Sequence, residues 1–221
     1  MLPRDTKEAG DLFFVPLSAV CSYSAAMPSP VGHSCLGLTL GVACLVPRLR
    51  AGEWRAVLRD NRGALLATVI AANACDFDYL PGLFIGAPNL LHRWLGHTAL
   101  WAALAGVVIW MIWRRVAAPL PRWALPVLVT AALTHIVADY FDEDTRAPFG
   151  ILALWPFYDG FVISSHPVFL SLEKGSLAAA CSWHNMRAVA HEALLTLPPL
   201  LAVVFYKLRP MRHDAAPKKA A

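Results

Sequence analysis

A histidine and an aspartate four residues apart in an apolar stretch are the first candidates for chemistry in this sequence. His135 and Asp139 lie in the run Ala132–Asp139, and an acidic cluster, Asp142–Asp144, follows it. This spacing puts both side chains on one face of a helix. An imidazole beside a carboxylate can bind one metal ion, and it can also form a hydrogen-bonded pair inside a buried helix. The acidic cluster is typical of a solvated loop.

The composition predicts an integral membrane protein. The chain has 221 residues, of which 57% are hydrophobic and 15% charged, and its mean hydropathy is +0.51. Soluble domains carry about 25% charged residues. We expect one membrane-embedded all-α domain over residues 1–221. The net charge of +4 is spread over loops, so nucleic-acid binding is not expected. The five cysteines are scattered through mostly apolar runs and predict buried free thiols.

Apolar runs predict a polytopic bundle of about five transmembrane helices. Several runs are shorter than the roughly 20 residues that a spanning helix needs, and Pro198-Pro199 interrupts the last. Residues 1–30 are expected to form an N-terminal interfacial segment, and two short apolar pieces at 151–157 and 168–172 to be interfacial or re-entrant. The five runs are Ser34–Val46, Ala64–Cys75, Leu95–Trp113, Trp123–Ala138 and Ala188–Tyr206.

Lysine and arginine are concentrated after the first, third and fifth runs. These basic segments alternate along the chain with the other connecting segments, as five crossings require. The positive-inside rule makes these places cytoplasmic, including a basic tail over residues 207–221, and puts the N-terminus outside. The basic residues are Arg48, Arg50, Arg55, Arg59 and Arg62, then Arg114, Arg115 and Arg122, then Lys207, Arg209, Arg212, Lys218 and Lys219.

Histidines and acids from five segments fall on the outer side in this topology, although only Lys and Arg were used to assign it. Ionisable groups are costly near the bilayer unless they have partners, and nitrogen and oxygen donors suit zinc or a similar divalent ion. Separately satisfied histidines are the alternative. The predicted metal ligands are His33, Asp76, Asp78, His92, His97, His135 and Asp139, with His166, His184 and His191 as further candidates.

Two of these segments have spacings that need an irregular backbone. His92 and His97 would diverge on one ideal helix, so we expect His92 in a loop and His97 in the first turn of the next helix. Asp76 and Asp78 are expected in an extended segment that ends at Pro81. One could bind metal while the other bridges or acts as a base. Solvated acids in a turn at a helix end are the alternative.

The ordered set of motifs resembles the YdjM-like family of inner-membrane metal-dependent hydrolases. That family has a lone early His, Asp-Ile-Asp, His-Arg-Gly-x-Thr-His-Ser, His-x-x-x-Asp, a Gly and Trp-Pro. The sequence has His33, Asp76-Phe-Asp78, His92-Arg-Trp-Leu-Gly-His-Thr98, His135-x-x-x-Asp139 and Leu154-Trp-Pro-Phe157. Trp94, Gly96 and Thr98 depart from the pattern. The family is distantly similar to zinc-dependent phospholipase C enzymes.

The resemblance implies a zinc-dependent hydrolase of the inner membrane that cleaves a phosphate ester of a lipid at the outer face. Asp78 or Asp76 would be the general base, and Arg93 would hold an anionic substrate oxygen. Glu192 is a third candidate catalytic residue. His191-Glu192 begins like a metalloprotease helix, but Leu195 stands where the second histidine belongs.

Three alternatives come from other classes. A metal-independent lipid phosphatase with a histidine nucleophile would also use His-x-x-x-Asp, but Val129 stands where its arginine should be. A metal-binding transporter would hold its site near the midplane between internal repeats, and no repeat is visible. A non-catalytic membrane scaffold could carry a structural metal.

Overall fold

Helices make up all the regular structure in the residues that the computed structural model describes, which are 28–48, 53–84, 92–117, 120–145, 149–173, 178 and 181–209. The predicted all-α class is confirmed over this part of the chain. Most of the predicted N-terminal segment and of the basic tail lies outside it. The α-helices are α2 (Pro30–Leu40), α3 (Trp54–Ala72), α4 (Tyr79–Phe84), α5 (Ala99–Val116), α6 (Ala124–Tyr140) and α8 (Trp183–Leu208). The π-helical η1 spans Gly41–Leu45, and the 3₁₀ helices η2 and η3 span Ala74–Asp78 and Leu95–His97.

Hydroxyl side chains fix where three of the helices begin. Ser29 caps α2 by accepting from the Val31 amide, Thr98 caps α5, and Ser182 caps α8. Such caps satisfy amides that the first helical turn leaves without partners. The cap of α5 therefore directly follows His97, and His33 lies in the first turn of α2.

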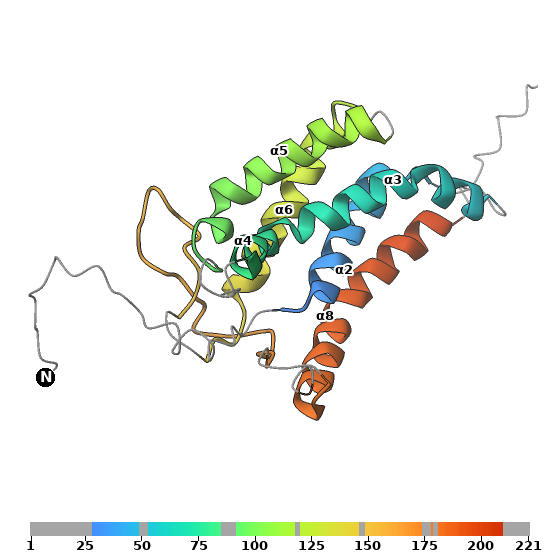
Figure 1. Cartoon of the computed structure of the whole chain (residues 1–221). Coiled ribbons are helices and arrows are strands. Elements are labelled where there is room, and N and C mark those ends of the chain that lie inside the picture. The colour runs from blue at the N-terminus through green and yellow to red at the C-terminus, as the bar shows by residue number, and fades with distance from the viewer. Residues whose placement is uncertain are drawn as a thin grey trace, which may run out of the picture.

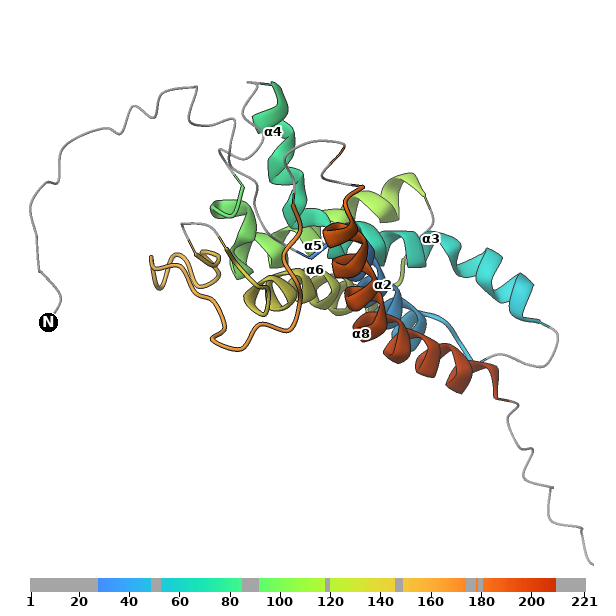
Figure 2. The same ribbon diagram turned by 90° about the horizontal axis from the view of Figure 1, so that it is seen from below.

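The helices form one bundle in which α5 packs on α6, α3 on α2 and α6, and α2 on α8. Small residues allow close contact, as membrane helices commonly use. A Cβ atom at Gly106 would lie 2.7 Å from the Val129 Cα, so α5 and α6 touch backbone to backbone. Figures 1 and 2 show that the ends of α3 and α6 and the starts of α2, α5 and α8 share one end of the bundle.

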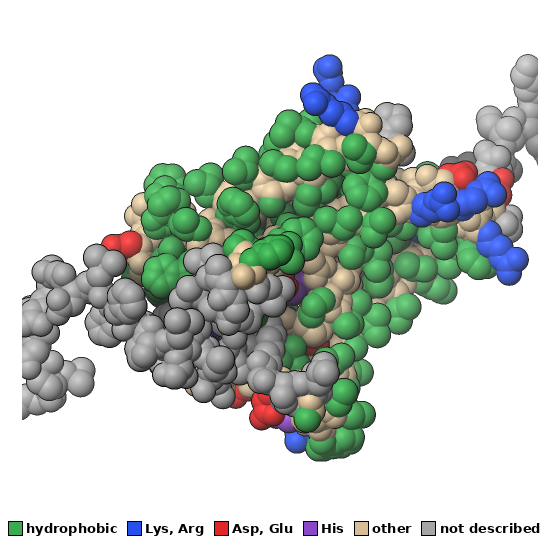
Figure 3. Space-filling model, in the orientation of Figure 1, with side chains coloured by type: hydrophobic (Ala, Val, Ile, Leu, Met, Phe, Trp, Pro, Cys, Tyr) green, Lys and Arg blue, Asp and Glu red, His purple; other side chains and the backbone are tan. Residues whose placement is uncertain are grey.

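Among the described residues, two helices, α5 and α8, are long and apolar enough to cross a membrane. Only 11% and 17% of their most apolar windows are buried, whereas the core helix of a soluble protein would be mostly buried. Large side chains such as Leu104 and Ile112 are exposed along α5, and hydrophobic side chains cover this face (Figure 3). The apolar helices α2–η1 and α6 are shorter, so the five-span count and the orientation stay predictions.

Three local predictions are wrong. The last helix is continuous and contains both Pro198 and Pro199, as membrane helices tolerate when other groups satisfy the backbone. Residues 55–62, expected in a loop, form the first turns of α3. The segment with Asp76 and Asp78 is not extended but forms η2. Local 3₁₀ bonding puts the two carboxylates on different sides of that short helix.

Candidate metal centre

Four donor atoms from three segments, η2, η3 and α6, converge at the shared end of the bundle. They are His97 Nε2, His135 Nε2, Asp76 Oδ1 and Asp139 Oδ2. The His97 nitrogen lies 3.4 Å from that of His135, 3.4 Å from Asp139 and 3.8 Å from Asp76. The His135 nitrogen lies 3.3 Å from Asp139 and 3.6 Å from Asp76.

Four of these five separations match the edges of a tetrahedral metal site, and the fifth, between His97 and Asp76, is slightly longer at 3.8 Å. Zinc at about 2.0–2.2 Å from each donor requires donors about 3.3–3.6 Å from one another. Charge-assisted hydrogen bonds between the same groups would be shorter, about 2.7–2.9 Å. Moreover, Asp76 Oδ1 and both Asp139 oxygens are buried and have no hydrogen bond within the described part of the chain. The four donors therefore fit a divalent ion better than they fit one another.

The second ring nitrogen of each histidine fixes the tautomer that a metal needs. His135 Nδ1 donates to the Ala72 carbonyl at 2.8 Å, and His97 Nδ1 donates to Asp78 Oδ2 at 2.9 Å. Both acceptors require N–H at Nδ1, so Nε2 of each neutral ring carries the lone pair. Metal-binding histidines are commonly oriented in this way by a carbonyl or a carboxylate.

His33 adds a second position beside the first. Its Nε2 lies 3.4 Å from Asp139 Oδ1, the oxygen that does not face His97, and its ring stacks on His135 with centroids 3.8 Å apart. Both His33 nitrogens are buried and form no hydrogen bond with the residues that the structure describes. Asp139 can thus bridge two ions, one through each oxygen, as carboxylates do in two-metal sites.

Asp78 connects His92 to the centre. Its second oxygen, Oδ1, accepts from His92 Nδ1 at 2.7 Å, and Tyr79 stacks on the His92 ring with centroids 3.7 Å apart. The group Asp78, His92 and His97 could itself hold an ion. Because both Asp78 oxygens already bind imidazoles, we interpret it mainly as the residue that orients His97.

Charges determine the pKa values at the rim of the site, outside the two candidate spans. Burial by itself would raise the pKa values of Asp76 and Asp78, but the neighbouring histidines outweigh it and lower both. Burial would lower the pKa of His97, but Asp76, Asp78 and Asp139 outweigh it and raise that pKa to about 9. Without a metal, His97 therefore carries a proton at neutral pH.

Gly96 is required by the position of Asp78. A Cβ atom there would lie 2.5 Å from Asp78 Oδ2 and 2.7 Å from its Cβ. The glycine that departs from the expected family motif therefore makes room for the carboxylate that orients His97.

Arg93 has a buried partner that the sequence did not indicate. Its Nη1 donates to Asp144 Oδ2 at 2.6 Å, and the same oxygen accepts from the Gly150 amide at 2.7 Å. The prediction of a solvated acidic loop is therefore wrong: the Asp144 side chain is only 2% exposed, and Asp142 is buried too. A buried guanidinium needs a counter-ion. The only sign of this ion pair in the sequence was the acidic residue that follows His135-x-x-x-Asp139 closely in the chain.

Glu192 belongs to none of the three groups of possible metal ligands among the described residues. These groups are His33, His135 and Asp139; Asp76, His97 and His135; and Asp78, His92 and His97. Its Oε2 accepts from the Ser29 amide at 3.1 Å and from the Ser29 hydroxyl, so it ties α8 to the start of α2, where His33 follows. A Cβ atom at Gly32 would overlap its carboxylate. The position supports a structural role in holding His33.

The three further histidine candidates are not brought to the centre. His166 is exposed and bonded to Ser165. His184 Nε2 donates to the Ser171 carbonyl at 2.8 Å. His191 lies on α8 one residue before Glu192, and none of the three belongs to a ligand group among the described residues.

The family model described as YdjM inner membrane protein matches residues 27–211. The chain belongs to the YdjM inner membrane protein family. The match includes every residue of the centre, from His33 to Asp139, and the predicted resemblance is confirmed. No curated protein and no solved structure matches the chain, and the similarity of this YdjM family member to phospholipase C stays a prediction.

Proposed function

We propose that this YdjM family member is a membrane-bound, metal-dependent hydrolase that uses zinc or a similar divalent ion. The observation that carries the proposal is a pair of histidine nitrogens 3.4 Å apart, each 3.3–3.8 Å from two carboxylate oxygens. These oxygens are buried and have no hydrogen bond among the described residues. His97, His135, Asp76 and Asp139 would hold one ion. His33 and the second Asp139 oxygen would hold another.

A divalent ion bound here would lower the pKa of water and polarise the scissile group. The surrounding residues would determine how the substrate reaches the ion and would accept the proton from the water. Asp76 is the most open acid of the set, with 20% of its side chain exposed, whereas Asp139 is 1% exposed. Substrate would therefore approach from the side of Asp76. This carboxylate replaces Asp78 as our preferred proton acceptor, because both Asp78 oxygens accept hydrogen bonds from imidazoles.

A lipid with a phosphate ester is the substrate class that the surroundings favour. The Ala99 amide at the start of α5 donates to the Ala153 carbonyl at 2.9 Å, so the loop at 154–158 lies near the end of a candidate span. That loop exposes Trp155, Tyr158 and Phe157, the last at 95%. Aromatic side chains concentrate where a membrane meets water. The loop would keep the lipid headgroup beside the centre.

Arg93 would act indirectly in this mechanism. Its guanidinium is buried against Asp144, and it follows His92 directly in the chain. We propose that the ion pair fixes the loop carrying His92 and His97, while the centre itself attracts the phosphate.

The test is metal analysis of the purified full-length protein together with turnover on phospholipids in mixed micelles. We expect at least one bound divalent ion, loss of turnover with a chelator, and recovery with zinc. Asp139→Ala should lose metal and activity, whereas His166→Ala, which changes an exposed histidine, should keep both. Turnover that survives full metal removal would support the histidine-nucleophile phosphatase instead. Wild-type metal content in Asp139→Ala would contradict the ligand assignment.

A further inference from the structure

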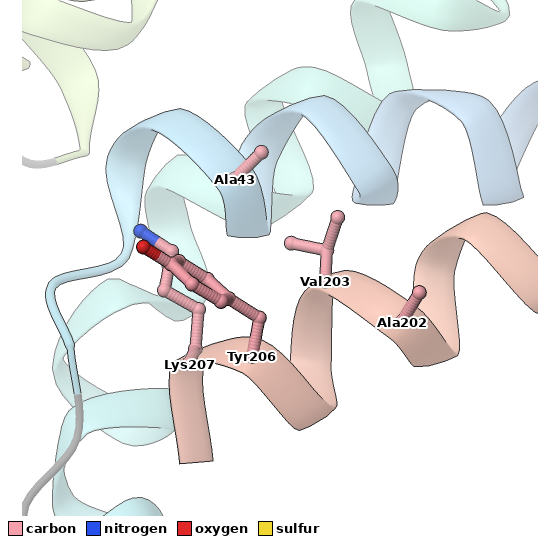
Figure 4. Close-up of a pocket in the computed structure, with 5 residues that line it drawn as sticks. All are labelled: Ala43, Ala202, Val203, Tyr206 and Lys207. Atoms are coloured by element: carbon pink, nitrogen blue, oxygen red, sulfur yellow. The ribbon is translucent and has the colours of Figure 1, made fainter. Parts of the chain in front are cut away.

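An open groove lies between η1 and α8, at the end of the bundle opposite the metal centre. It has a volume of about 300 Å³ and is lined by Ala43, Ala202, Val203, Tyr206 and Lys207. Figure 4 shows the side chains of α8 lying against the segment that carries Ala43. Ala43, Ala202 and Val203 make this part of the groove apolar.

Positive charge gathers at the Tyr206 end of this groove. The Lys207 ammonium donates to the Val46 carbonyl at 2.6 Å, which holds it between η1 and α8. The Arg48 guanidinium lies 4.5 Å from the centre of the Tyr206 ring. The groove thus runs from small apolar side chains to a group of cations beside an exposed phenol.

We propose that this groove binds one phospholipid whose headgroup has a net negative charge. The groove lies on α8, a helix apolar and long enough to cross the membrane, so its apolar part would face acyl chains. Its cations lie at the end of that helix, Lys207 in the last turn and Arg48 just after η1, where Lys and Arg reach the level of lipid phosphates. Basic pockets between membrane helices recognise anionic headgroups in this way. A zwitterionic headgroup would place its own positive charge beside these cations, so it should bind more weakly.

The groove is separate from the metal centre, and the proposal does not depend on hydrolysis. Binding can be measured by native mass spectrometry of the full-length protein with added phosphatidylglycerol or phosphatidylcholine of the same acyl chains. We expect phosphatidylglycerol to be retained about fivefold more than phosphatidylcholine, since each basic residue near an anionic lipid has an effect of about this size.

Two variants test the two halves of the groove. Arg48→Gln should weaken phosphatidylglycerol binding about fivefold, and Ala202→Trp should weaken it by filling the apolar part. Arg122→Gln is the control, because Arg122 is an exposed arginine just before α6 and its loss changes the net charge equally. Should Ala202→Trp fail to fold, the two arginine variants decide alone. Equal binding of the two lipids, or equal weakening by both arginine variants, would overturn the proposal.

Discussion

Raising the pH should tighten metal binding well above the range in which an ordinary histidine titrates. In the metal-free protein three carboxylates raise the pKa of His97 to about 9. Nε2 can bind an ion only after its proton leaves. Below pH 9 the proton therefore competes with the metal, and the affinity rises with pH until the ring is neutral. Asp76 contributes little to this change because its pKa is lowered and it is already ionised.

The size of the effect follows from the fraction of neutral imidazole. With a pKa of about 9, that fraction rises about ninefold between pH 7 and pH 8. With the ordinary pKa of about 6.5, it would rise only about 1.3-fold over the same interval. The interval from pH 7 to pH 8 therefore separates the two cases.

Cobalt or zinc affinity should be measured by competition with a chelator of known pH dependence, in detergent, at half-unit steps from pH 6.5 to pH 8.5. Asp78→Asn removes one of the charges that raise the pKa of His97, so its affinity should depend less on pH. It should also bind metal about 10–100-fold more weakly, because it orients that ring less firmly. A wild-type affinity that changes less than about twofold from pH 7 to pH 8 would refute the role of His97.

Other predictions follow from the packing and the topology. Gly96→Thr should push aside the aspartate that orients the adjacent histidine and weaken metal binding about 10–100-fold without changing the helical circular dichroism. Gly106→Val should separate α5 from α6 and destabilise the protein by about 1–3 kcal/mol in thermal unfolding, whereas Gly63→Ala, whose Cβ atom meets only the Trp113 ring at 3.5 Å, should be tolerated. An impermeant thiol reagent on intact cells should label a cysteine placed at Asp159 and spare one at Arg55; the reverse pattern would invert the orientation.

Much of the helix arrangement could be predicted from the sequence, because hydrophobic runs and capping residues are local signals. Five apolar runs correspond to α2–η1, α3, α5, α6 and α8. The placement of His92 in a turn was also correct, whereas His97 was expected in the first turn of the next helix and instead ends η3, just before α5. Antiparallel neighbours bring alternate ends together, so the order of polar residues along the chain was enough to predict that His33, the Asp76 segment and Asp139 share one end.

The backbone path between helices could not be predicted in the same way. Asp76-Phe-Asp78 has no periodicity long enough to distinguish an extended segment from a 3₁₀ turn. Likewise, an acidic segment is interpreted as a solvated loop unless a buried cation is known to face it. Here that cation is Arg93, which lies 51 residues from Asp144 in the chain. Such pairs are decided by which segments the folded chain brings together.

The sequence by itself therefore determined the residue types of the centre, the helices that carry them and the end of the bundle where they meet. The tertiary structure decided what each atom does there. His135 presents Nε2 because its Nδ1 reaches the Ala72 carbonyl, and Glu192 is occupied by Ser29 rather than by the centre. The reason is physical: a helix face is set by local periodicity, whereas the direction of a lone pair depends on a partner that is distant in the chain.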